Sequence, residues 1–536
     1  MVKPRTQSTL VIGTSFFIVL FTNVSFFQHV LEAYPFDSTY APFVLSQGLV
    51  FFLFLVLFFS LLSWSHITKP FLIVMLMIAA MANYFMQTYN IIVDKTMIES
   101  IVETDVSEVF DLVSWKLFAY VIGLGVLPSY FIYKTPIVYH GIKKELFSKL
   151  KLSAGSFVLI FVIMLPFSKS YTSFFREHKI LRSYTNPTYG LYSLGSYIKA
   201  QVKDRNVPLK HTGLDAKIEP REKRRVIIMV VGEATRADHF SLNGYERETN
   251  PLLKKENIIN FSNMYSCGTT TAVSVPCMFS IYDRSAYNTQ KGLHTENVLD
   301  VLSHAGVEVL WRDNNSNSKG VADRVKYEHY KTPKNNTMCV GECRDEGMLV
   351  GLEQRIEESD KDMIIVLHQM GNHGPAYYKR YPKAFEHFTP TCQTNQLEEC
   401  SQQEIANAYD NALLYTDYFL SRTIELLKKY EETINTAMFY MSDHGESLGE
   451  GGFYLHGLPY FIAPEAQTHV GSLLWLGKDF PLDKEKLRKV ASNEFSHDNL
   501  FSTLLGLLDV QTEVYEKEMD MFQFNRLYNT RLLTKH

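Results

Sequence analysis

AMFYMSDHGES, residues 437–447, is the most informative stretch of this chain. Its first five residues are apolar and predict a buried strand, which runs out into Ser442, Asp443 and His444. In open α/β sheets, ligands and chemistry collect at the carboxyl ends of strands. Carboxylate and imidazole groups bind zinc, and catalytic zinc sites keep one position open. The stretch therefore favours a metal site at the edge of a sheet. The alternative is a turn whose Asp caps the next helix.

Three other apolar runs also end in polar residues. They are residues 226–231, followed by Gly232 and Glu233; residues 307–311, followed by Arg312, Asp313 and Asn314; and residues 363–367, followed by His368. Helical stretches such as residues 405–430 lie between such runs. Short apolar strands that alternate with helices predict a mostly parallel sheet covered on both faces. The polar residues predict that metal or phosphate binds along one edge of this sheet.

The segment from Cys267 to Cys277 supplies a nucleophile. It carries several hydroxyl groups at a Gly-led turn into a helix, and the free N–H groups at a helix N-terminus favour anions. A metal beside such a hydroxyl lowers its pKa and makes it a better nucleophile. These arguments do not choose among Thr269, Thr270 and Thr271. The alternative is a threonine-rich helix cap that a disulfide closes.

Other polar residues suit a phosphate group. His373, in the loop 371–375, and His456 are candidates for a second metal or a phosphate oxygen, or are ordinary loop histidines. Lys319 lies in a donor-rich loop, residues 314–320, that suits phosphate or forms a surface turn. Together the residues indicate metal-assisted transfer of a phosphoryl-type group. A hydroxyl is the nucleophile and cations support the developing charge.

The first part of the chain is a membrane domain. It holds five apolar stretches, residues 9–30, 41–64, 70–90, 116–134 and 152–168, near the roughly 20 residues that a bilayer requires. Basic loops alternate with acidic ones, and basic loops stay in the cytoplasm. A cytoplasmic N-terminus and five crossings place everything after Tyr171 outside the cytoplasm. All six cysteines follow residue 266, which agrees with disulfides in an oxidising compartment and disfavours reduced thiols of a cytosolic enzyme.

The expected domain limits follow from these patterns. Residues 1–170 form the transmembrane domain, residues 171–225 a bridging linker with short helices, and residues 226–536 the catalytic domain. A helical loop, residues 91–115, places Ser100, Thr104 and Glu108 on one face. This stripe suits a cationic lipid headgroup, or it is a solvated acidic helix. The net charge of −4 gives no indication of nucleic-acid binding.

At these residues the chain resembles the bacterial phosphoethanolamine transferases that modify lipid A, including the mobile colistin-resistance group. The matching stretches are residues 231–233, 243–247, 266–280, 311–315, 368–375, 409–411, 442–450 and 454–457. The resemblance covers essentially the whole chain, while Asp-His-Gly alone is shared across the wider alkaline-phosphatase-like superfamily. It implies five transmembrane helices followed by a soluble α/β/α domain of the alkaline-phosphatase and sulfatase type.

The resemblance also implies roles for particular residues. Glu233, Thr271, Asp443 and His444 surround a zinc ion, and Thr271 is the nucleophile. His373 and His456 match residues that bind phosphate or a second zinc. The headgroup pocket matches Asn315, Ser316 and Lys319 in the soluble half, and Ser100, Thr104 and Glu108 in the membrane half. Ser100 is a departure, since the colistin-resistance relatives carry Asn there.

The cysteines differ from those of the relatives. Many chromosomal relatives have cysteines on both sides of the loop lysine, where this chain has Ser318 and Ala322. The remaining pairs are expected between nearest neighbours in sequence, which is one of several arrangements that six cysteines allow. These pairs are Cys267–Cys277, Cys339–Cys343 and Cys392–Cys400.

The activity that the resemblance implies is a two-step transfer in the bacterial inner membrane. A monomer with a cytoplasmic N-terminus and a periplasmic catalytic domain takes phosphoethanolamine from phosphatidylethanolamine, a membrane lipid. A phosphoethanolamine-threonine intermediate passes the group to a lipid A phosphate, which gives polymyxin resistance.

The alternatives are transfer of glycerophosphate, or transfer of phosphoethanolamine to another envelope glycan. A sulfatase would carry a Cys-x-Pro-x-Arg segment, which the sequence lacks. A scaffold with a structural zinc would use four Cys or His ligands.

Overall fold

The computed structural model describes residues 4–103, 106–139, 141–203 and 207–523, without the side chains of residues 106–108 and 203. The chain forms two compact units. The first contains residues 1–98 and 113–199, and the second contains residues 99–112 and 200–536. The short segment 99–112 therefore belongs to the unit that carries the sheet, although it lies between apolar helices in the sequence. The three-part division expected from the sequence, with limits at residues 170 and 225, remains a prediction, since the two compact units follow a different criterion.

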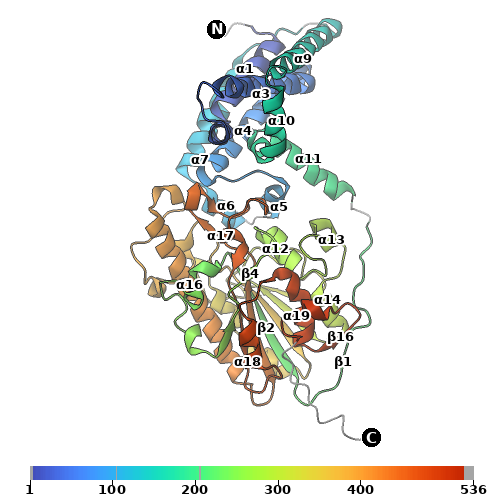
Figure 1. Cartoon of the computed structure of the whole chain (residues 1–536), viewed down its shortest axis with the longest axis vertical. Coiled ribbons are helices and arrows are strands. Elements are labelled where there is room, and N and C mark those ends of the chain that lie inside the picture. The colour runs from blue at the N-terminus through green and yellow to red at the C-terminus, as the bar shows by residue number, and fades with distance from the viewer. Residues whose placement is uncertain (1–3, 104–105, 140, 204–206, 524–536) are drawn as a thin grey trace. The chain divides into compact units, whose positions relative to one another are not determined.

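The first unit is a bundle of apolar helices (Figure 1). In the described residues, 4 helices are long and apolar enough to cross a membrane, and a bent pair makes up to 5. They are α3 (Ala41–Leu62), η1 with α4 (Ser65–Tyr89), the run α7, η2 and α8 (Trp115–Lys134), α9 (Ile142–Met164), and the bent pair α1 (Gln7–Phe21) and α2 (Val24–Ala33). These helices coincide with the five predicted stretches, although α9 begins at Ile142, well before residue 152.

The bend between α1 and α2 was not predicted. The two helices meet at 58°, where the buried Asn23 interrupts the run of backbone hydrogen bonds. The Asn23 side chain donates to the Ile18 carbonyl at 3.0 Å and to the Asn186 carbonyl at 2.8 Å, and it accepts from the Asn186 N–H at 2.8 Å. Side-chain groups that replace backbone partners are a known cause of helix kinks.

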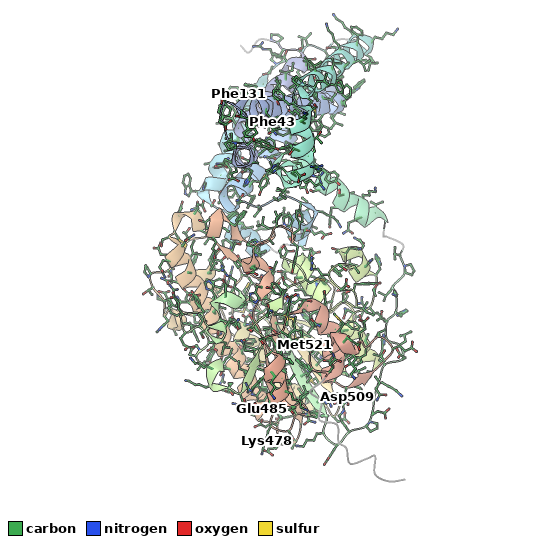
Figure 2. All side chains as sticks on the ribbon, viewed as in Figure 1. Phe43, Phe131, Lys478, Glu485, Asp509 and Met521 are labelled. Carbon is green, nitrogen blue, oxygen red and sulfur yellow. A yellow bond between two sulfur atoms is a disulfide. The ribbon has the colours of Figure 1, made fainter. Side chains whose placement is uncertain are left out.

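Aromatic side chains separate the interior of this bundle from its outer surface. Phe43 on α3 is 2% exposed, whereas Phe131 on α8 (Leu127–Lys134) is 65% exposed (Figure 2). Large exposed apolar side chains are unfavourable in water but match the hydrocarbon of a bilayer. The outer surface of the bundle is therefore suited to lipid.

The second unit is built on a seven-stranded sheet. Its order is β3 (Ile258–Asn260), β14 (Ser472–Leu476), β10 (Asn435–Ser442), β2 (Arg225–Gly232), β9 (Met363–His368), β5 (Glu308–Asp313) and β6 (Lys326–His329). Strands β10, β2, β9, β5 and β6 pair in parallel, while β14 is antiparallel to both of its neighbours. This arrangement confirms the predicted mostly parallel sheet.

Helices cover both faces of the sheet, as predicted (Figure 1). Ile227, Met229 and Val231 of β2 pack with α12 (Thr271–Met278), α14 (Val298–His304), α18 (Lys484–Val490) and α19 (Leu500–Leu507). The alternate residues Val226, Ile228 and Val230 pack with α15 (Leu352–Glu358) and α16 (Gln402–Lys428). Because successive strand residues point to opposite faces, one continuous apolar run serves both layers.

Candidate active site

Two neighbouring strands bring the first two acidic residues of the site together. In the parallel pairing of β2 and β10, Gly232 lies opposite Ser442. Glu233 and Asp443, each the next residue along its strand, therefore leave the sheet at the same level. Both side chains are fully buried. Ala234 has a φ of 54°, a left-handed conformation that non-glycine residues rarely adopt outside constrained sites.

Thr271 reaches the same place from another element. It is the first residue of α12, with Thr270 as its N-cap. Its Oγ1 donates to Glu233 Oε2 at 3.1 Å and lies 3.3 Å from His444 Nε2. Thr269 instead donates to the Leu458 carbonyl at 2.7 Å. The Thr270 hydroxyl forms no hydrogen bond among the described residues. Of the three threonines, Thr271 is thus the one whose hydroxyl contacts Glu233 and His444.

His444 completes the cluster. Its Nδ1 lies 2.8 Å from the Gly445 carbonyl, which only accepts, so Nδ1 carries a proton. Its Nε2 faces the cluster, 3.3 Å from Glu233 Oε1 and 3.5 Å from Asp443 Oδ2. A histidine whose second nitrogen donates to a carbonyl is oriented as metal-binding histidines commonly are.

The two buried carboxylates of the cluster, Glu233 and Asp443, favour a positive charge beside them. Burial and the charge of Glu233 raise the pKa of Asp443 to about 6. Burial opposes a charged histidine, but the Asp443 and Glu233 carboxylates raise the pKa of His444 to about 10. Without a metal, a proton on His444 therefore occupies the position that a cation would take.

The residues present fit a divalent metal. Ligand atoms of Glu233, Asp443 and His444 all lie within 4.8 Å of one another. Among the described residues, Glu233 Oε1 and Asp443 Oδ2 are buried oxygens that form no hydrogen bond. Buried polar atoms are normally paired, and two buried carboxylates side by side are costly without a compensating cation. Carboxylate and imidazole ligands with a neighbouring hydroxyl suit zinc.

A second group of ligands adjoins the first. Ligand atoms of His444, Glu446 and His456 also lie within 4.8 Å of one another. Glu446 is fully buried, and it accepts from His456 Nδ1 and from the Tyr377 hydroxyl, both at 2.8 Å. The rings of His373 and His456 are 5.9 Å apart. Sequence reasoning missed Glu446, although its place directly after Asp443, His444 and Gly445 was a signal.

The expected headgroup residues separate into two kinds. Asn315 Nδ2 donates to Glu233 Oε2 at 2.7 Å, so Asn315 supports the acidic cluster, and its Oδ1 accepts the Ser316 N–H at 2.7 Å. Lys319 is deeply buried, with Nζ 3.3 Å from the Glu103 carbonyl and 3.6 Å from Glu103 Oε2. A cavity of about 30 Å³ lies between Lys319, Glu103 and Ala272. Lys319 and helix α12 thus share one small cavity.

Of the three residues expected on one face of the segment 99–112, the structure describes the side chain of Ser100 alone. Ser100 and Glu103 lie in α5 (Lys95–Glu103), and α6 (Val106–Leu112) follows. Thr104 and the side chain of Glu108 lie outside the described residues.

Disulfides join the three expected pairs, Cys267–Cys277, Cys339–Cys343 and Cys392–Cys400. The first of these encloses Thr271 in a short covalent loop. The disulfide ties the turn that precedes α12 to the last turn of this helix.

His497 links the segment that precedes α12 to the end of strand β10. It is buried, its Nδ1 accepts the Cys267 N–H at 3.1 Å, and its Nε2 donates to the Ser442 carbonyl at 2.9 Å. Burial lowers its pKa to about 3, so the ring stays neutral. Sequence reasoning missed His497 because it lies far from both segments in the chain.

Acid is expected to destabilise the folded protein through His497. Its folded pKa of about 3 lies below the ordinary value of 6.5, so the unfolded chain binds more protons between these values. This stability is fully present above pH 6.5 and is lost as pH falls through that window, by about 2 kcal/mol at pH 5. Thermal unfolding at pH 7 and pH 5 in detergent micelles measures the effect. A His497→Gln variant should lose about 2 kcal/mol less on acidification.

The exposed His329 provides the control for this measurement. A His329→Gln variant should respond to acid as the wild type does. Equal acid sensitivity of all three proteins would contradict the assignment to His497.

Arg380 connects the segment 99–112 to the second ligand group. Its side chain is 3% exposed, and it contacts Asp111 Oδ2 at 2.7 Å, Glu342 Oε1 at 2.5 Å and the His373 carbonyl at 2.6 Å. Burial opposes ionisation of Asp111, but Arg380 and Lys379 hold the pKa of that carboxyl below its usual value. The Asp111 of α6 therefore helps to hold the His373 loop.

Replacing Arg380 by glutamine is expected to lower the free energy of unfolding by about 3–5 kcal/mol, because it leaves Asp111 and Glu342 without their buried cation. Arg422→Gln is the matched control, since the Arg422–Glu425 pair is about half exposed and should contribute less than about 1 kcal/mol. Unfolding in detergent micelles compares the two variants. Equal stabilities would show that the buried pair does not hold the loop.

The comparisons with known proteins agree with this geometry. Residues 225–510 match the sulfatase family, and residues 51–202 match a family described as phosphoethanolamine transferase EptA/EptB. Phosphatidylethanolamine transferase Mcr-1 from Escherichia coli is 42% identical over 94% of this chain and 95% of its own length. The chain belongs to the phosphoethanolamine transferase family. It is therefore an enzyme of this class, as the resemblance implied.

Further members of the phosphoethanolamine transferase family match over the same extent. Phosphoethanolamine transferase EptA from Escherichia coli K12 is 41% identical over 95% of each protein. The solved structure of the integral membrane lipooligosaccharide phosphoethanolamine transferase A from Neisseria meningitidis superposes with a TM-score of 0.94 at 36% identity. That match covers 98% of this chain and 100% of that one. The helical membrane part and the α/β domain predicted from the sequence are thus both confirmed.

Proposed function

We propose that this enzyme moves phosphoethanolamine from phosphatidylethanolamine to a phosphate of lipid A through a phosphoethanolamine-threonine intermediate at Thr271. One observation carries the proposal. The Thr271 hydroxyl, at the N-terminus of α12, contacts both Glu233 and His444. Beside it lie two buried carboxylate oxygens that form no hydrogen bond in the part of the chain that the structure describes. The donor and acceptor are those that the relatives' names indicate, since one is called a phosphatidylethanolamine transferase and another a Kdo(2)-lipid A phosphoethanolamine transferase.

In the first step, Thr271 Oγ1 attacks the donor phosphorus and the bond from phosphorus to the diacylglycerol oxygen breaks. Glu233 Oε2, which already accepts the hydroxyl hydrogen bond, takes the proton and returns it to the diacylglycerol oxygen. In the second step, an oxygen of a singly protonated lipid A phosphate attacks the same phosphorus, and the bond from phosphorus to Thr271 Oγ1 breaks. The proton of that phosphate passes to Thr271 Oγ1 and restores the hydroxyl. The N–H groups at the start of α12 face the negative phosphoryl group.

Zinc is the metal proposed for this site. Glu233, Asp443, His444 and Thr271 would hold it, and its charge would lower the pKa of the threonine hydroxyl. His456 and Glu446 support phosphate binding or a second zinc, with His373 beside them. Asn315 orients Glu233 through its 2.7 Å hydrogen bond.

The headgroup is proposed to bind beside the nucleophile helix. In this proposal Lys319, Ser316 and Asn315 contact the headgroup from the soluble half, and Ser100, Thr104 and Glu108 contact it from the segment 99–112. The buried contact of Lys319 with Glu103 supports this proposal. This contact brings Glu103, at the end of α5, beside the loop 314–320 that also contains Ser316.

The proposed location is the inner membrane, with a cytoplasmic N-terminus, a periplasmic catalytic domain and a monomeric enzyme. Both substrates are lipids, so anchoring in the membrane raises their effective concentration at the site. The ethanolamine amine offsets a negative phosphate on lipid A. This change weakens the attraction of cationic peptides such as polymyxin.

Mass spectrometry of lipid A tests the proposal. Cells that produce the protein should contain lipid A with one additional phosphoethanolamine, and cells with an empty vector should not. A lipid A modified by glycerophosphate instead would show a different donor. Unmodified lipid A with a modified envelope glycan would show a different acceptor. Either result would replace the proposed reaction.

A further inference from the structure

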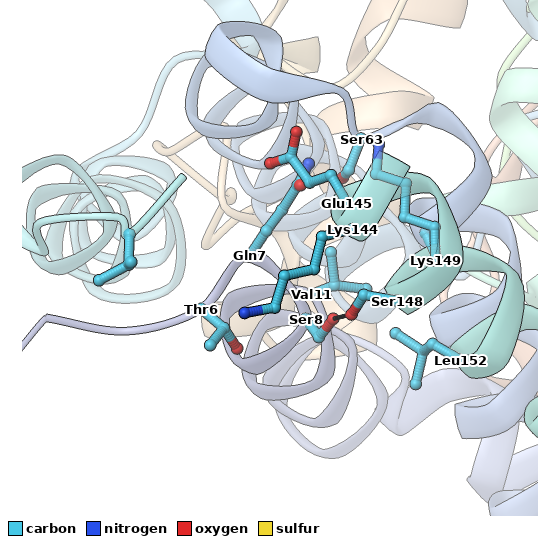
Figure 3. Close-up of a pocket in the computed structure, with 12 residues that line it drawn as sticks. Thr6, Gln7, Ser8, Val11, Ser63, Lys144, Glu145, Ser148, Lys149 and Leu152 are labelled. Carbon is cyan, nitrogen blue, oxygen red and sulfur yellow. Dashed lines mark hydrogen bonds between the residues drawn. The ribbon is translucent and has the colours of Figure 1, made fainter. Parts of the chain in front are cut away.

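A polar cavity lies within the membrane unit, at the end where the chain begins. It has a volume of about 230 Å³ and is formed by the start of α1, the end of α3 and the first turns of α9. Figure 3 shows side chains from these three segments around it. The lining residues with polar groups used below are Gln7, Ser8, Ser63, Lys144, Glu145 and Lys149. All belong to the unit that does not contain Thr271.

Two uncharged side chains offer buried polar atoms to this cavity without a partner. Ser63 is fully buried and Gln7 is 7% exposed. In the described part of the chain, Ser63 Oγ and Gln7 Oε1 form no hydrogen bond, while the Gln7 amide N–H group donates to Thr68. Buried polar atoms in folded proteins nearly always have a partner. The cavity is therefore suited to a polar ligand.

Charges of both signs line the same cavity. Lys149 Nζ and Glu145 Oε1 are buried and form no hydrogen bond within the described residues. No ion pair joins them, although they lie one turn apart on α9. Lys149 Nζ instead lies 4.1 Å from the centre of the Trp64 ring. A second cation, Lys144, also lines the cavity. Separate cationic and anionic groups complement a ligand that itself carries both charges.

An apolar groove adjoins the polar cavity. It has a volume of about 400 Å³, runs along α1, α3 and α9, and shares Ser8, Ser148 and Leu152 with the cavity. Its other lining includes Ile12, Phe52, Leu53, Val56 and Leu159. Pockets for drug-sized ligands measure about 300–1,000 Å³ and have mostly apolar walls. The groove falls in that range and suits an acyl chain, whereas the polar cavity of about 230 Å³ is smaller and suits a headgroup alone. A free phosphate compound would leave the groove unused.

We infer that this cavity and groove bind an ethanolamine phospholipid of the surrounding membrane, at a site separate from the transfer site. The lipid phosphate contacts Lys144, Lys149 and the Ser63 hydroxyl, since lysine is a common phosphate ligand. The ethanolamine ammonium pairs with Glu145, and one acyl chain follows the groove past Leu152. The inference does not depend on the proposed transfer, because binding requires no chemistry at Thr271.

Photo-crosslinking on the full-length protein tests this inference. The protein is prepared in a Thr271→Ala background, so that no donor is consumed, and is reconstituted with phosphatidylethanolamine that carries a photoactivatable group on one acyl chain. Crosslinked peptides are then mapped. Labelling is expected in peptides that contain Ile12, Phe52 or Leu159. Unlabelled phosphatidylethanolamine should compete at least about tenfold better than phosphatidylglycerol or soluble glycerophosphoethanolamine, because each competitor lacks either the amine or the chains.

Variants identify the groups that bind the headgroup. Glu145→Gln should abolish the preference for phosphatidylethanolamine over phosphatidylglycerol. The double variant Ser63→Ala, Lys149→Met should reduce labelling of the groove about tenfold. Lys143→Met is the matched control, because Lys143 is an exposed neighbour on α9 that does not line the cavity, and it should label as the wild type does.

Three results would overturn the inference. The first is equal competition by phosphatidylglycerol in the wild type, which would show general attraction of anionic lipids. The second is equal competition by the soluble headgroup. The third is labelling that no variant changes. If the double variant does not fold, Glu145→Gln and the competition experiments on the wild type still decide the outcome. Failure of lipid A modification would leave this test unaffected.

Discussion

Replacing Thr271 by alanine is expected to reduce transfer on the order of 10³-fold or more, which is the scale of losing a catalytic nucleophile. The variant keeps the acidic cluster, because Glu233, Asp443 and His444 do not depend on the hydroxyl for their position. It loses the oxygen that lies 3.1 Å from Glu233 and 3.3 Å from His444. Transfer is measured as phosphoethanolamine on lipid A, and the covalent intermediate as added mass on the protein.

Two control variants make this result specific. Thr271→Ser keeps a hydroxyl at the same place and should retain part of the activity and the modified protein mass. Thr270→Ala removes the neighbouring hydroxyl, which is buried and forms no hydrogen bond among the described residues, either with the cluster or with the first turn of α12. It should keep most of the transfer. If Thr271→Ala still modifies lipid A, or if the added mass maps to Thr270, another nucleophile carries the reaction.

Removal of the metal is expected to abolish transfer and to destabilise the second unit. Among the described residues, Glu233 Oε1 and Asp443 Oδ2 are buried without hydrogen bonds, with the ring of His444 beside them. A divalent cation there would offset more of the cost of burying two carboxylates than one protonated histidine does. A metal present at about a thousandfold above its Kd stabilises the folded state by about 4 kcal/mol. Thermal unfolding and lipid A modification are measured after chelation and again after addition of zinc.

An Asp443→Asn variant serves as the control for chelation, because it lacks one proposed ligand. A chelator should shift the unfolding temperature of the wild type more than that of this variant. Zinc should restore both stability and transfer in the wild type alone. A wild type that keeps full activity after exhaustive chelation would contradict a metal at this site.

Much of the fold follows from local patterns. The apolar stretches are as long as a bilayer is thick, so they identify the membrane helices without any tertiary information. The runs that end before Glu233, His368 and Asp443 predicted parallel strands, because a strand buried on both faces has no polar alternation. The bend at Asn23 was missed, since its cause is a hydrogen bond to Asn186, which is distant in the chain.

Part of the candidate active site could likewise be predicted from the sequence, and part only from the structure. The sequence by itself predicted Glu233, Asp443 and His444 as candidate metal ligands, and it determined their position just after strand ends. It did not choose Thr271 over Thr269 and Thr270, except through a resemblance. The structure separates them, because only the start of α12 directs one hydroxyl into the cluster.

Tertiary structure alone revealed the supporting residues. Glu446 beside His456, His497 between Cys267 and Ser442, and Arg380 with Asp111 are contacts across strands, loops and separate helices. Local sequence patterns record helix and strand periods and apolar runs, and these set which segments form and which face they bury. Which side chains then meet depends on strand order and register, here the parallel pairing of Gly232 with Ser442, and no local pattern contains that information.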